Sequence, residues 1–219
     1  MKNKVFSSIY VIFAIFFTIC FSIGLPIYIR EFYFIQIDNL KIAEKTGVSE
    51  QDIKSSYNEL MDYLVYPNEE FSTGVFSYSE EGKNHFADCK ALFSLNSIVL
   101  ISSTVGIVFI KTLNKKGKIS LLRPKGLTLF SLSGIINLVL FSALGVLAVL
   151  DFDKAFTVFH KIFFAGKDNW LFDSRYDEII KALPEEFFMN CGILIISSVA
   201  ILSVTYIIYG IATRKKCFE

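Results

Sequence analysis

The sequence is poor in the residues that build metal and nucleotide sites. Its 219 residues include only two histidines and four cysteines, and no C-x-x-C or H-E-x-x-H spacing occurs. A glycine-rich phosphate-binding loop is also absent. Zinc sites usually need closely spaced ligands, and phosphate-binding loops need glycines that let the backbone approach the phosphate. The sequence therefore predicts no metal site and argues against nucleotide-driven chemistry.

Charged residues are missing from four long apolar runs. None of the four contains Lys, Arg, Asp, Glu or His, and the mean hydropathy of the chain is +0.50. A bilayer-spanning helix needs about 20 apolar residues, and in lipid the backbone must satisfy its own hydrogen bonds. We therefore predict an all-α membrane protein, a four-transmembrane-helix bundle forming one integral membrane domain over residues 1–219. The predicted spans are residues 5–29, 92–110, 127–150 and 188–212.

The uncharged runs also limit the function of the membrane part. Ion paths and proton relays use ionisable residues inside the membrane, so their absence counts against a transporter subunit. The first run is interpreted as an uncleaved signal anchor, because it is longer than a signal-peptide core and no A-x-A-like site follows. Cys20 does not fit a lipoprotein signal, since Ile19 precedes it in place of a small residue.

Charge outside the runs is segregated by sign. The N-terminal tail, residues 111–126 and residues 213–216 carry only basic charges, whereas residues 30–91 and 151–187 hold 20 of the 21 acidic residues. Lys and Arg near helix ends stay in the cytoplasm. We therefore predict that both termini and the loop 111–126 are cytoplasmic. The loops 30–91 and 151–187 are then extracytoplasmic, and only they are long enough to build a site.

The first large loop shows signals for short helices. Ser49 is a candidate N-cap for a helix that ends before Pro67, and its apolar residues repeat at helical spacing. Such a helix is typical of a membrane surface or of the side of a bundle. The β-leaning run at residues 73–78 favours a short hairpin or a cap, which leaves the structure of residues 66–78 open. Ser79 is a second candidate cap, for a helix running into the second span. The apolar face of the first helix consists of Ile53, Tyr57, Leu60, Met61 and Leu64.

The second large loop is rich in aromatic residues. Residues 156–164 read FTVFHKIFF, which is too short to span and should lie in the interface or against the bundle. Trp170 is interpreted as an interfacial anchor, and Asp168 and Asn169 as turn residues. Residues 174–183 are predicted to form a short amphipathic helix that stops at Pro184.

The two histidines, His85 and His160, both fall in these loops, in aromatic surroundings. Most histidines in such places pack or hydrogen-bond, but imidazole is also the commonest general acid–base in enzymes. His85, Asp88 and Cys89 lie at i, i+3 and i+4, so Asp88 is a candidate to orient the His85 ring, although such neighbours also pair for ordinary helix stability. Cys89 and Cys191 both lie near extracytoplasmic helix ends, so a disulfide and two free thiols are both compatible with the sequence.

Two stretches resemble a known family. YSEEGKNHFADCKALF, residues 78–93, and the segment FTVFHKIFFAGKDNWLFDSRYDEIIKALPEEFF, residues 156–188, are similar to the bacterial lipoprotein intramolecular transacylases, four-helix membrane proteins of Gram-positive bacteria. Phe86 and Cys89 depart from the pattern, where Met or Leu and Val are expected. The matching positions are Ser79, His85, Asp88, Lys90, Phe159, His160, Phe163, Phe164, Asn169, Trp170, Phe172, Asp177, Pro184, Glu185, Phe187 and Phe188.

The resemblance implies an activity. The sn-2 acyl chain of a diacylglyceryl lipoprotein moves to the α-amine of the same cysteine, which gives a lyso-form lipoprotein and needs no cofactor. It further implies that His85 and His160 are catalytic, in unassigned roles. Expected partners are diacylglyceryl lipoproteins and membrane lipid, without nucleic acid or nucleotide, and the protein is expected to be a monomer in the bacterial cytoplasmic membrane. Asp88, Asn169, Trp170 and Asp177 are supporting candidates, and Phe159, Phe163 and Phe164 are candidates to line the acyl chains.

A non-enzymatic tetraspan protein is the alternative. An adaptor or assembly factor that acts through its outer loops would show the same topology. The histidines discriminate the two hypotheses, because a catalyst should lose activity when either imidazole is removed, whereas an adaptor should tolerate both changes.

Overall fold

The computed structural model describes residues 2–214 and consists of helices joined by loops and turns. The helices are α1 (Lys2–Tyr28), α2 (Glu31–Asn39), α3 (Ile42–Thr46), α4 (Glu50–Val65), α5 (Glu80–Lys115), the 3-10 turn η1 (Pro124–Gly126), α6 (Leu129–Leu150), α7 (Phe152–Phe163), α8 (Ile179–Ala182) and α9 (Glu185–Arg214). Four of them, α1, α5, α6 and α9, are long and apolar enough to cross a membrane. The predicted all-α class with four spans is confirmed.

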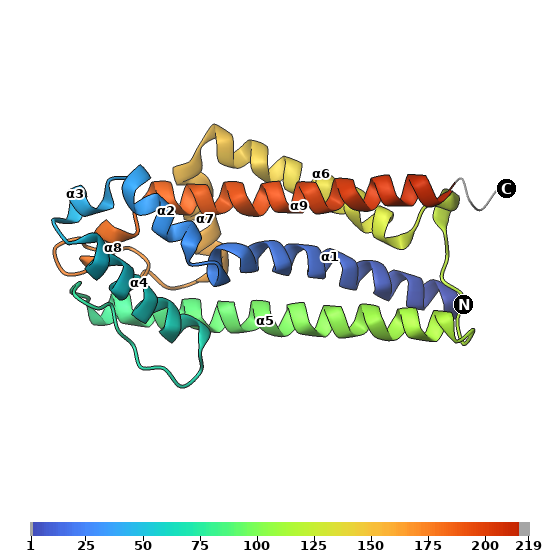
Figure 1. The fold of residues 1–219 in the computed structure, drawn as a ribbon, viewed down its shortest axis with the longest axis horizontal. Coiled ribbons are helices and arrows are strands. Elements are labelled where there is room, and N and C mark those ends of the chain that lie inside the picture. Colours follow the sequence, from blue (N-terminus) through green and yellow to red (C-terminus); the bar gives the residue numbers. More distant parts are fainter. Residues whose placement is uncertain (1, 215–219) are drawn as a thin grey trace. The chain divides into compact units, whose positions relative to one another are not determined.

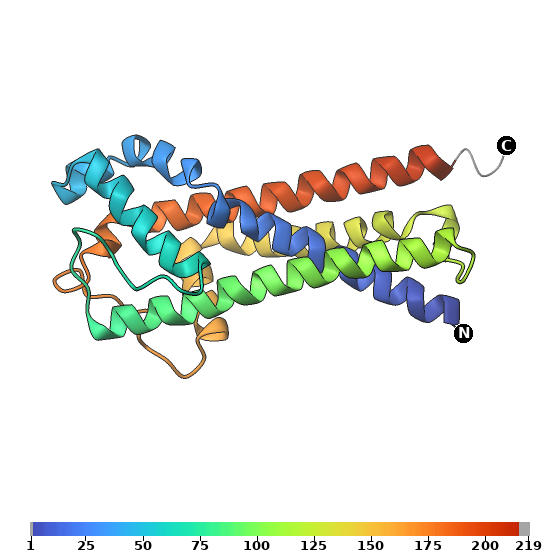
Figure 2. The ribbon, with the colours of Figure 1, turned by 60° about the horizontal axis from the view of Figure 1, so that its bottom comes forward.

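The described chain divides into two compact units. Unit 1 comprises residues 1–24, 96–147 and 194–219, and unit 2 comprises residues 25–95 and 148–193. In unit 1, parts of α1, α5, α6 and α9 run alongside one another (Figures 1 and 2). The buried side chains at one of their contacts are Tyr10, Val11, Ala14, Ile107, Ile110 and Leu129.

Helix α5 is longer than a membrane is thick. Its 36 residues extend about 54 Å at 1.5 Å per residue, whereas a hydrocarbon core is about 30 Å thick. Its charge-free run covers residues 92–110, so the turns from Glu80 to Ala91 lie outside the spanning segment. A helix running from Ser79 into the second span was predicted from the sequence, and the continuous helix α5 confirms it.

Unit 2 is built around stacked aromatic side chains. The rings of Tyr33 (α2) and Tyr57 (α4) stack with centroids 3.8 Å apart, and Phe187 of α9 meets Tyr33 edge-on at 5.2 Å. The Tyr33 hydroxyl donates to the carbonyl of Ala182 in α8 at 2.7 Å. These contacts join the two large loops within one unit, and α2, α3, α4 and α8 lie close together (Figure 1).

Helix α4 follows the sequence prediction closely. The Ser49 hydroxyl accepts from the backbone N–H of Asp52 at 3.1 Å, as an N-cap should, and the helix ends before Pro67. The five residues of its predicted apolar face are all buried. The face packs against protein in unit 2, which is the second of the two environments that the sequence allowed.

The structure rules out one of the alternatives left open for residues 73–78 and contradicts one local prediction. In the described chain residues 73–78 form no hairpin; Thr73 closes a tight turn instead, with its hydroxyl donating to the carbonyl of Phe76 at 2.6 Å. The helix predicted over residues 174–183 is reduced to α8, because residues 173–177 form turns. In these turns the backbone of Asp177 is not helical, and its carboxylate accepts hydrogen bonds from Ser79.

The thiols are free where the structure describes them. Cys20, Cys89 and Cys191 form no disulfide, so the structure has the free-thiol alternative for Cys89 and Cys191. Cys217, expected in the cytoplasmic tail, lies outside the described residues.

Gly74 offers a test of the turn that replaces the hairpin. Its φ is +57°, and a Cβ there would overlap the Ser56 side chain, whose hydroxyl accepts from the N–H of Val75 at 3.1 Å. We expect Gly74→Ala to lower the free energy of unfolding by about 1–3 kcal/mol, because the left-handed backbone and the overlap both oppose a side chain. Thermal unfolding in detergent measures the loss. Gly117→Ala is the control, since Gly117 has φ +68° with open space around it, so a loss as large there would mean that strain alone is responsible.

Candidate active site

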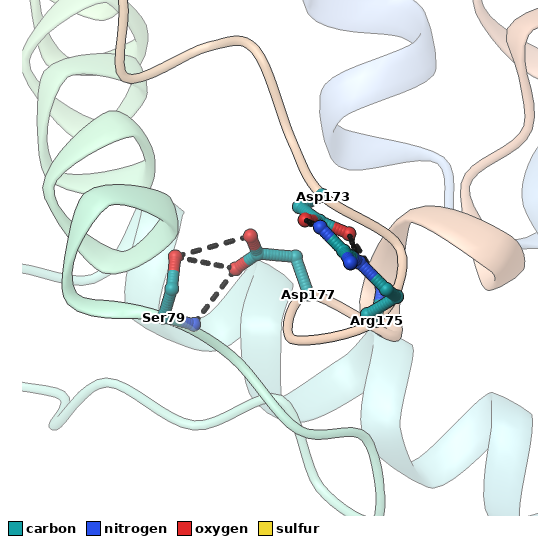
Figure 3. Close-up of polar contacts among 4 residues, drawn as sticks. All are labelled: Ser79, Asp173, Arg175 and Asp177. Atoms are coloured by element: carbon teal, nitrogen blue, oxygen red, sulfur yellow. Dashed lines mark hydrogen bonds and ion pairs between the residues drawn. The ribbon is translucent and has the colours of Figure 1, made fainter.

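The first turn of α5 is held by a carboxylate from the second large loop. Asp177, only 3% exposed, accepts from the Ser79 N–H at 2.7 Å and from its hydroxyl at 2.8 and 3.0 Å (Figure 3). The same hydroxyl accepts from the Gly82 N–H at 3.0 Å. Negative charge and hydrogen-bond acceptors are favourable at a helix N-terminus, where N–H groups lack helical partners. Asp177 therefore fixes the start of the helix that carries His85.

Gly82 allows this close approach. A Cβ at Gly82 would overlap the Asp177 carboxylate and would lie 3.1 Å from the Phe172 ring. Sequence reasoning did not single out Gly82. A glycine in the first turn of a helix is the signal that could have marked it, because glycine there often permits close contact with another segment.

Helix α7 carries the second histidine. The Asp151 side chain caps it by accepting from the Lys154 N–H at 2.9 Å. The Nδ1 atom of His160 lies 2.8 Å from the carbonyl oxygen of Phe156, one turn earlier. A carbonyl can only accept, so Nδ1 carries the proton and Nε2 keeps a lone pair. The backbone thus sets the tautomer of His160.

The two imidazoles share one aromatic enclosure. Their ring centroids are 5.8 Å apart, and both side chains are buried, 5% exposed for His85 and 7% for His160. Phe164 packs against both, at 4.7 Å from His85 and 5.6 Å from His160. Trp170 lies 4.9 Å from His160, and Phe172 meets His85 edge-on at 5.4 Å. The structure therefore brings the two predicted histidines together, from sequence positions 75 residues apart.

Burial keeps both imidazoles neutral. It lowers the pKa of His85 to about 4, with a further lowering from His160 nearby. It also lowers the pKa of His160 below its ordinary value. Charging an imidazole in an apolar enclosure costs free energy that water would otherwise supply. At neutral pH, both rings are therefore available to accept a proton.

Within residues 2–214, each imidazole has a nitrogen for which no strong hydrogen bond to protein is found. The Nδ1 atom of His85 is buried and has no hydrogen-bond partner among residues 2–214. Its Nε2 lies 3.5 Å from the Cys89 thiol, at the distance of a weak hydrogen bond. Buried polar atoms without partners are rare and point to a ligand or a function.

Asp88 does not hydrogen-bond to His85, contrary to the sequence hypothesis. Its carboxylate accepts from the Lys167 ammonium at 2.5 Å and from the Asn169 side-chain amide at 3.0 Å. The Trp170 indole N–H donates to the Lys167 carbonyl at 3.0 Å. Asp88 thus anchors the turn after α7, which places Trp170 against His160. Trp170 packs on an imidazole, which the anchor interpretation did not anticipate.

The three candidate phenylalanines divide into two environments. Phe164 is buried against both imidazoles, whereas Phe159 and Phe163 pack on each other at 4.6 Å and are about half exposed. Phe156 and Phe172, which were not site candidates, both contact an imidazole ring. Three or more His, Cys, Asp or Glu side chains placed to hold a metal are not found within residues 2–214.

The fold and the site define a membrane-integral protein with four apolar helices and a buried imidazole pair within one compact unit. A family model described as the lipoprotein intramolecular transacylase Lit matches residues 8–188. The chain belongs to this family of membrane acyltransferases. No curated protein matches the chain.

Solved structures show the same fold. The lipoprotein intramolecular transacylase Lit from Bacillus cereus is 24% identical, with a TM-score of 0.87 over 100% of this chain and 99% of that chain. Its form with an H85R mutation is 24% identical, with a TM-score of 0.80 over 99% of this chain and 94% of that chain. Its form with an H85A mutation is 23% identical, with a TM-score of 0.79 over 98% and 96%.

Proposed function

We propose that this chain moves the sn-2 acyl chain of a diacylglyceryl-modified cysteine to the α-amine of the same cysteine. The observation that carries the proposal is the buried, neutral imidazole pair, in which each ring has a nitrogen left for a substrate. Membership of the transacylase family supports the same reaction. The product is an amide at the cysteine nitrogen and a free hydroxyl on the glycerol.

His160 is the proposed base. Its Nε2 lone pair accepts the proton that the amine loses as its nitrogen attacks the ester carbonyl carbon. The C–N bond forms, and the carbonyl oxygen becomes a tetrahedral oxyanion. Because nucleophile and ester belong to one molecule, positioning supplies much of the rate.

His85 is the proposed electrophilic partner. With the Cys89 thiol donating to Nε2, the His85 ring carries its proton on the unpartnered Nδ1, which can donate to the oxyanion. When the tetrahedral intermediate collapses, the bond from the carbonyl carbon to the glycerol oxygen breaks. The proton held on His160 Nε2 goes to that oxygen, so both histidines return to their starting forms.

The other candidates have supporting roles in this proposal. Asp88 and Asn169 hold the turn after α7, and Asp177 holds the start of α5. Phe164 separates the imidazoles from water, while the exposed Phe159 and Phe163 contact acyl chains. The reaction uses no cofactor, and one copy of the chain contains all of these groups.

We also propose that the site faces away from the cytoplasm. The basic residues of the N-terminal tail and of residues 111–126 support cytoplasmic ends for the spans they flank. The imidazoles lie in the acidic loops, residues 30–91 and 151–187, at the opposite ends of these spans. A lipoprotein cysteine and its glycerol esters occupy the same extracytoplasmic membrane surface, in the bacterial cytoplasmic membrane.

Mass spectrometry of a lipoprotein N-terminal peptide tests the activity. In cells that lack other N-acylation, we expect the peptide to carry its acyl chain on nitrogen only when this protein is present. His85→Ala and His160→Ala should greatly reduce the shift, whereas Lys161→Ala, an exposed neighbour on α7, should preserve it. A diacylglyceryl peptide that stays unchanged with well-expressed wild-type protein would favour the adaptor alternative.

The ionisation of the pair gives a second test. The chain has only two histidines, so histidine-labelled protein gives two imidazole signals by NMR. We expect neither to titrate at its ordinary pKa, with His85 titrating at about 4. Since an unfolded histidine binds its proton near pH 6.5, the free energy of unfolding should fall as the pH is lowered from about 6.5 towards 4.

A variant tests the contribution of His160 to this shift. His160→Gln removes the repulsion between the two imidazoles, so the pKa of His85 should rise towards 6.5. Lys161→Gln on the same helix should leave it unchanged. Two signals titrating near 6.5 in the wild-type protein would mean that the imidazoles are solvated, contrary to the proposed mechanism.

A further inference from the structure

Unit 1 contains a cleft that the imidazole site does not use. It has a volume of about 210 Å³, and its walls come from α1, α5, α6, α9 and the connection between α5 and α6. Its polar and aromatic lining includes Lys111, Asn114, Arg123, Thr128, Phe130 and Tyr209. The cleft therefore combines two cations and hydrogen-bonding groups with aromatic walls.

The basic residues of the cleft lining are suited to an anionic ligand. Residues 111–126 contain six basic residues and no acidic one. Two of the six, Lys111 and Arg123, line the cleft. The Lys111 ammonium lies over the Phe130 ring, 4.8 Å from its centroid, a contact that leaves its N–H donors able to point at an anion. Arginine and lysine together are a common phosphate-binding set.

The walls of the cleft are fixed by the protein itself. The N–H of Leu121 donates to the Asn114 side chain at 3.0 Å, and the N–H of Leu122 donates to the Ser7 hydroxyl at 3.0 Å. Beside the cleft, the hydroxyl of Ser131, the residue after Phe130, donates to the Tyr206 carbonyl at 2.9 Å. A site whose loops are already tethered loses less conformational entropy when it binds.

The cleft lies at the ends of membrane-spanning runs, and this position favours a lipid as its ligand. Lys111 directly follows the uncharged run 92–110, and Thr128 lies at the start of the run 127–150. Residues at these ends lie at headgroup depth. Tyr209 is 62% exposed and Ile208 is 61% exposed, so an apolar helix surface continues from the cleft. A free phosphate would use the cations but not this surface.

We propose that this cleft binds an anionic phospholipid, with the phosphate between Lys111 and Arg123 and an acyl chain along the exposed side of α9. The proposal is independent of the transacylase reaction. Juxtamembrane basic residues contribute about 1 kcal/mol each to binding of anionic lipid. Removing both cations should therefore weaken binding about 10- to 30-fold.

Native mass spectrometry of the full chain in detergent, titrated with phosphatidylglycerol or phosphatidylcholine, tests the proposal. We expect preferential binding of phosphatidylglycerol and a 10- to 30-fold loss in Lys111→Gln/Arg123→Gln. The matched control is Lys116→Gln/Lys118→Gln, which makes the same charge change in the same segment but outside the cleft. It should retain most of the binding.

Three results would overturn the proposal. An equal loss in both double variants would mean that only net charge attracts the lipid. Equal binding of the two lipids would mean that the cations play no part. Competition by glycerol phosphate at concentrations close to those of the lipid would assign the cleft to a free phosphate. Arg123→Gln alone, with thermal unfolding measured without lipid, provides a milder variant if the double variant does not fold.

Discussion

Removing either imidazole is expected to lower the rate of acyl transfer by about 10²- to 10⁴-fold, the usual contribution of a general acid–base. When both imidazoles are removed, the rate should be less than 10-fold below that of the slower single variant. The reason is that in the proposed mechanism His85 and His160 act on the same tetrahedral intermediate, from rings 5.8 Å apart. Groups that work as a unit give strongly non-additive losses.

The measurement is a double-mutant cycle of His85→Ala and His160→Ala, with initial rates on a purified diacylglyceryl lipopeptide. The Phe156 carbonyl, which holds the His160 tautomer, is a backbone group and stays in place in all four proteins. Thermal unfolding without substrate shows whether each variant is folded. Losses that multiply in the double variant would mean that the histidines serve separate steps. Unchanged rates in folded variants would leave only the adaptor function.

Residual activity in these variants should remain above the background. The amine and the ester are tethered in one substrate, so an enclosure that excludes water and positions both still accelerates the reaction. Phe164 and Trp170 keep forming this enclosure when His85 is lost.

The membrane helices could be predicted from sequence because lipid imposes a strict condition. An uncharged run of about 20 residues has few alternatives to a helix when no water is present to satisfy its backbone. Helix α4 was predictable for a different reason, since Ser49 marks its start and the buried face repeats at helical spacing.

The contacts of the site were less predictable, because they join segments distant in sequence. Spacing suggested that Asp88 would orient His85, but neighbours at i and i+3 compete with any partner that a loop brings near. Lys167 and Asn169, about 80 positions away, occupy the carboxylate instead. The buried Nδ1 of His85 and the tautomer of His160 also depend on three-dimensional packing, which no sequence pattern specifies.

The shortened helix at residues 174–183 has the same origin. Its apolar spacing indicated helix, yet Asp177 has stronger partners outside the segment, because the N–H groups at the start of α5 attract a carboxylate. The long-range contact prevails over local propensity, which contributes only tenths of a kcal/mol per residue. Asp177 was recognised from the family resemblance, but its role in capping α5 follows only from the structure.

Asp177→Ala is accordingly expected to affect both stability and activity. The change removes a charged acceptor that serves both the N–H and the hydroxyl of Ser79 and leaves the N–H without its partner, which should lower the free energy of unfolding by about 3 kcal/mol. The rate of acyl transfer should also fall, even at temperatures where the variant stays folded. The reason is that the start of α5 positions His85, and the loop that carries Asp177 also holds Phe172 against His85.

Thermal unfolding and lipopeptide turnover, measured well below the unfolding temperature, separate the two effects. Asp173→Ala is the matched control, because Asp173 lies in the same turn and forms an exposed ion pair with Arg175 (Figure 3). It should change neither the unfolding temperature nor the rate. Hydrogen exchange at Ser79 and Gly82 should increase in Asp177→Ala alone. If turnover stays normal there while these amides exchange faster, the start of α5 does not position His85 for catalysis, and the imidazole is held by its aromatic neighbours instead.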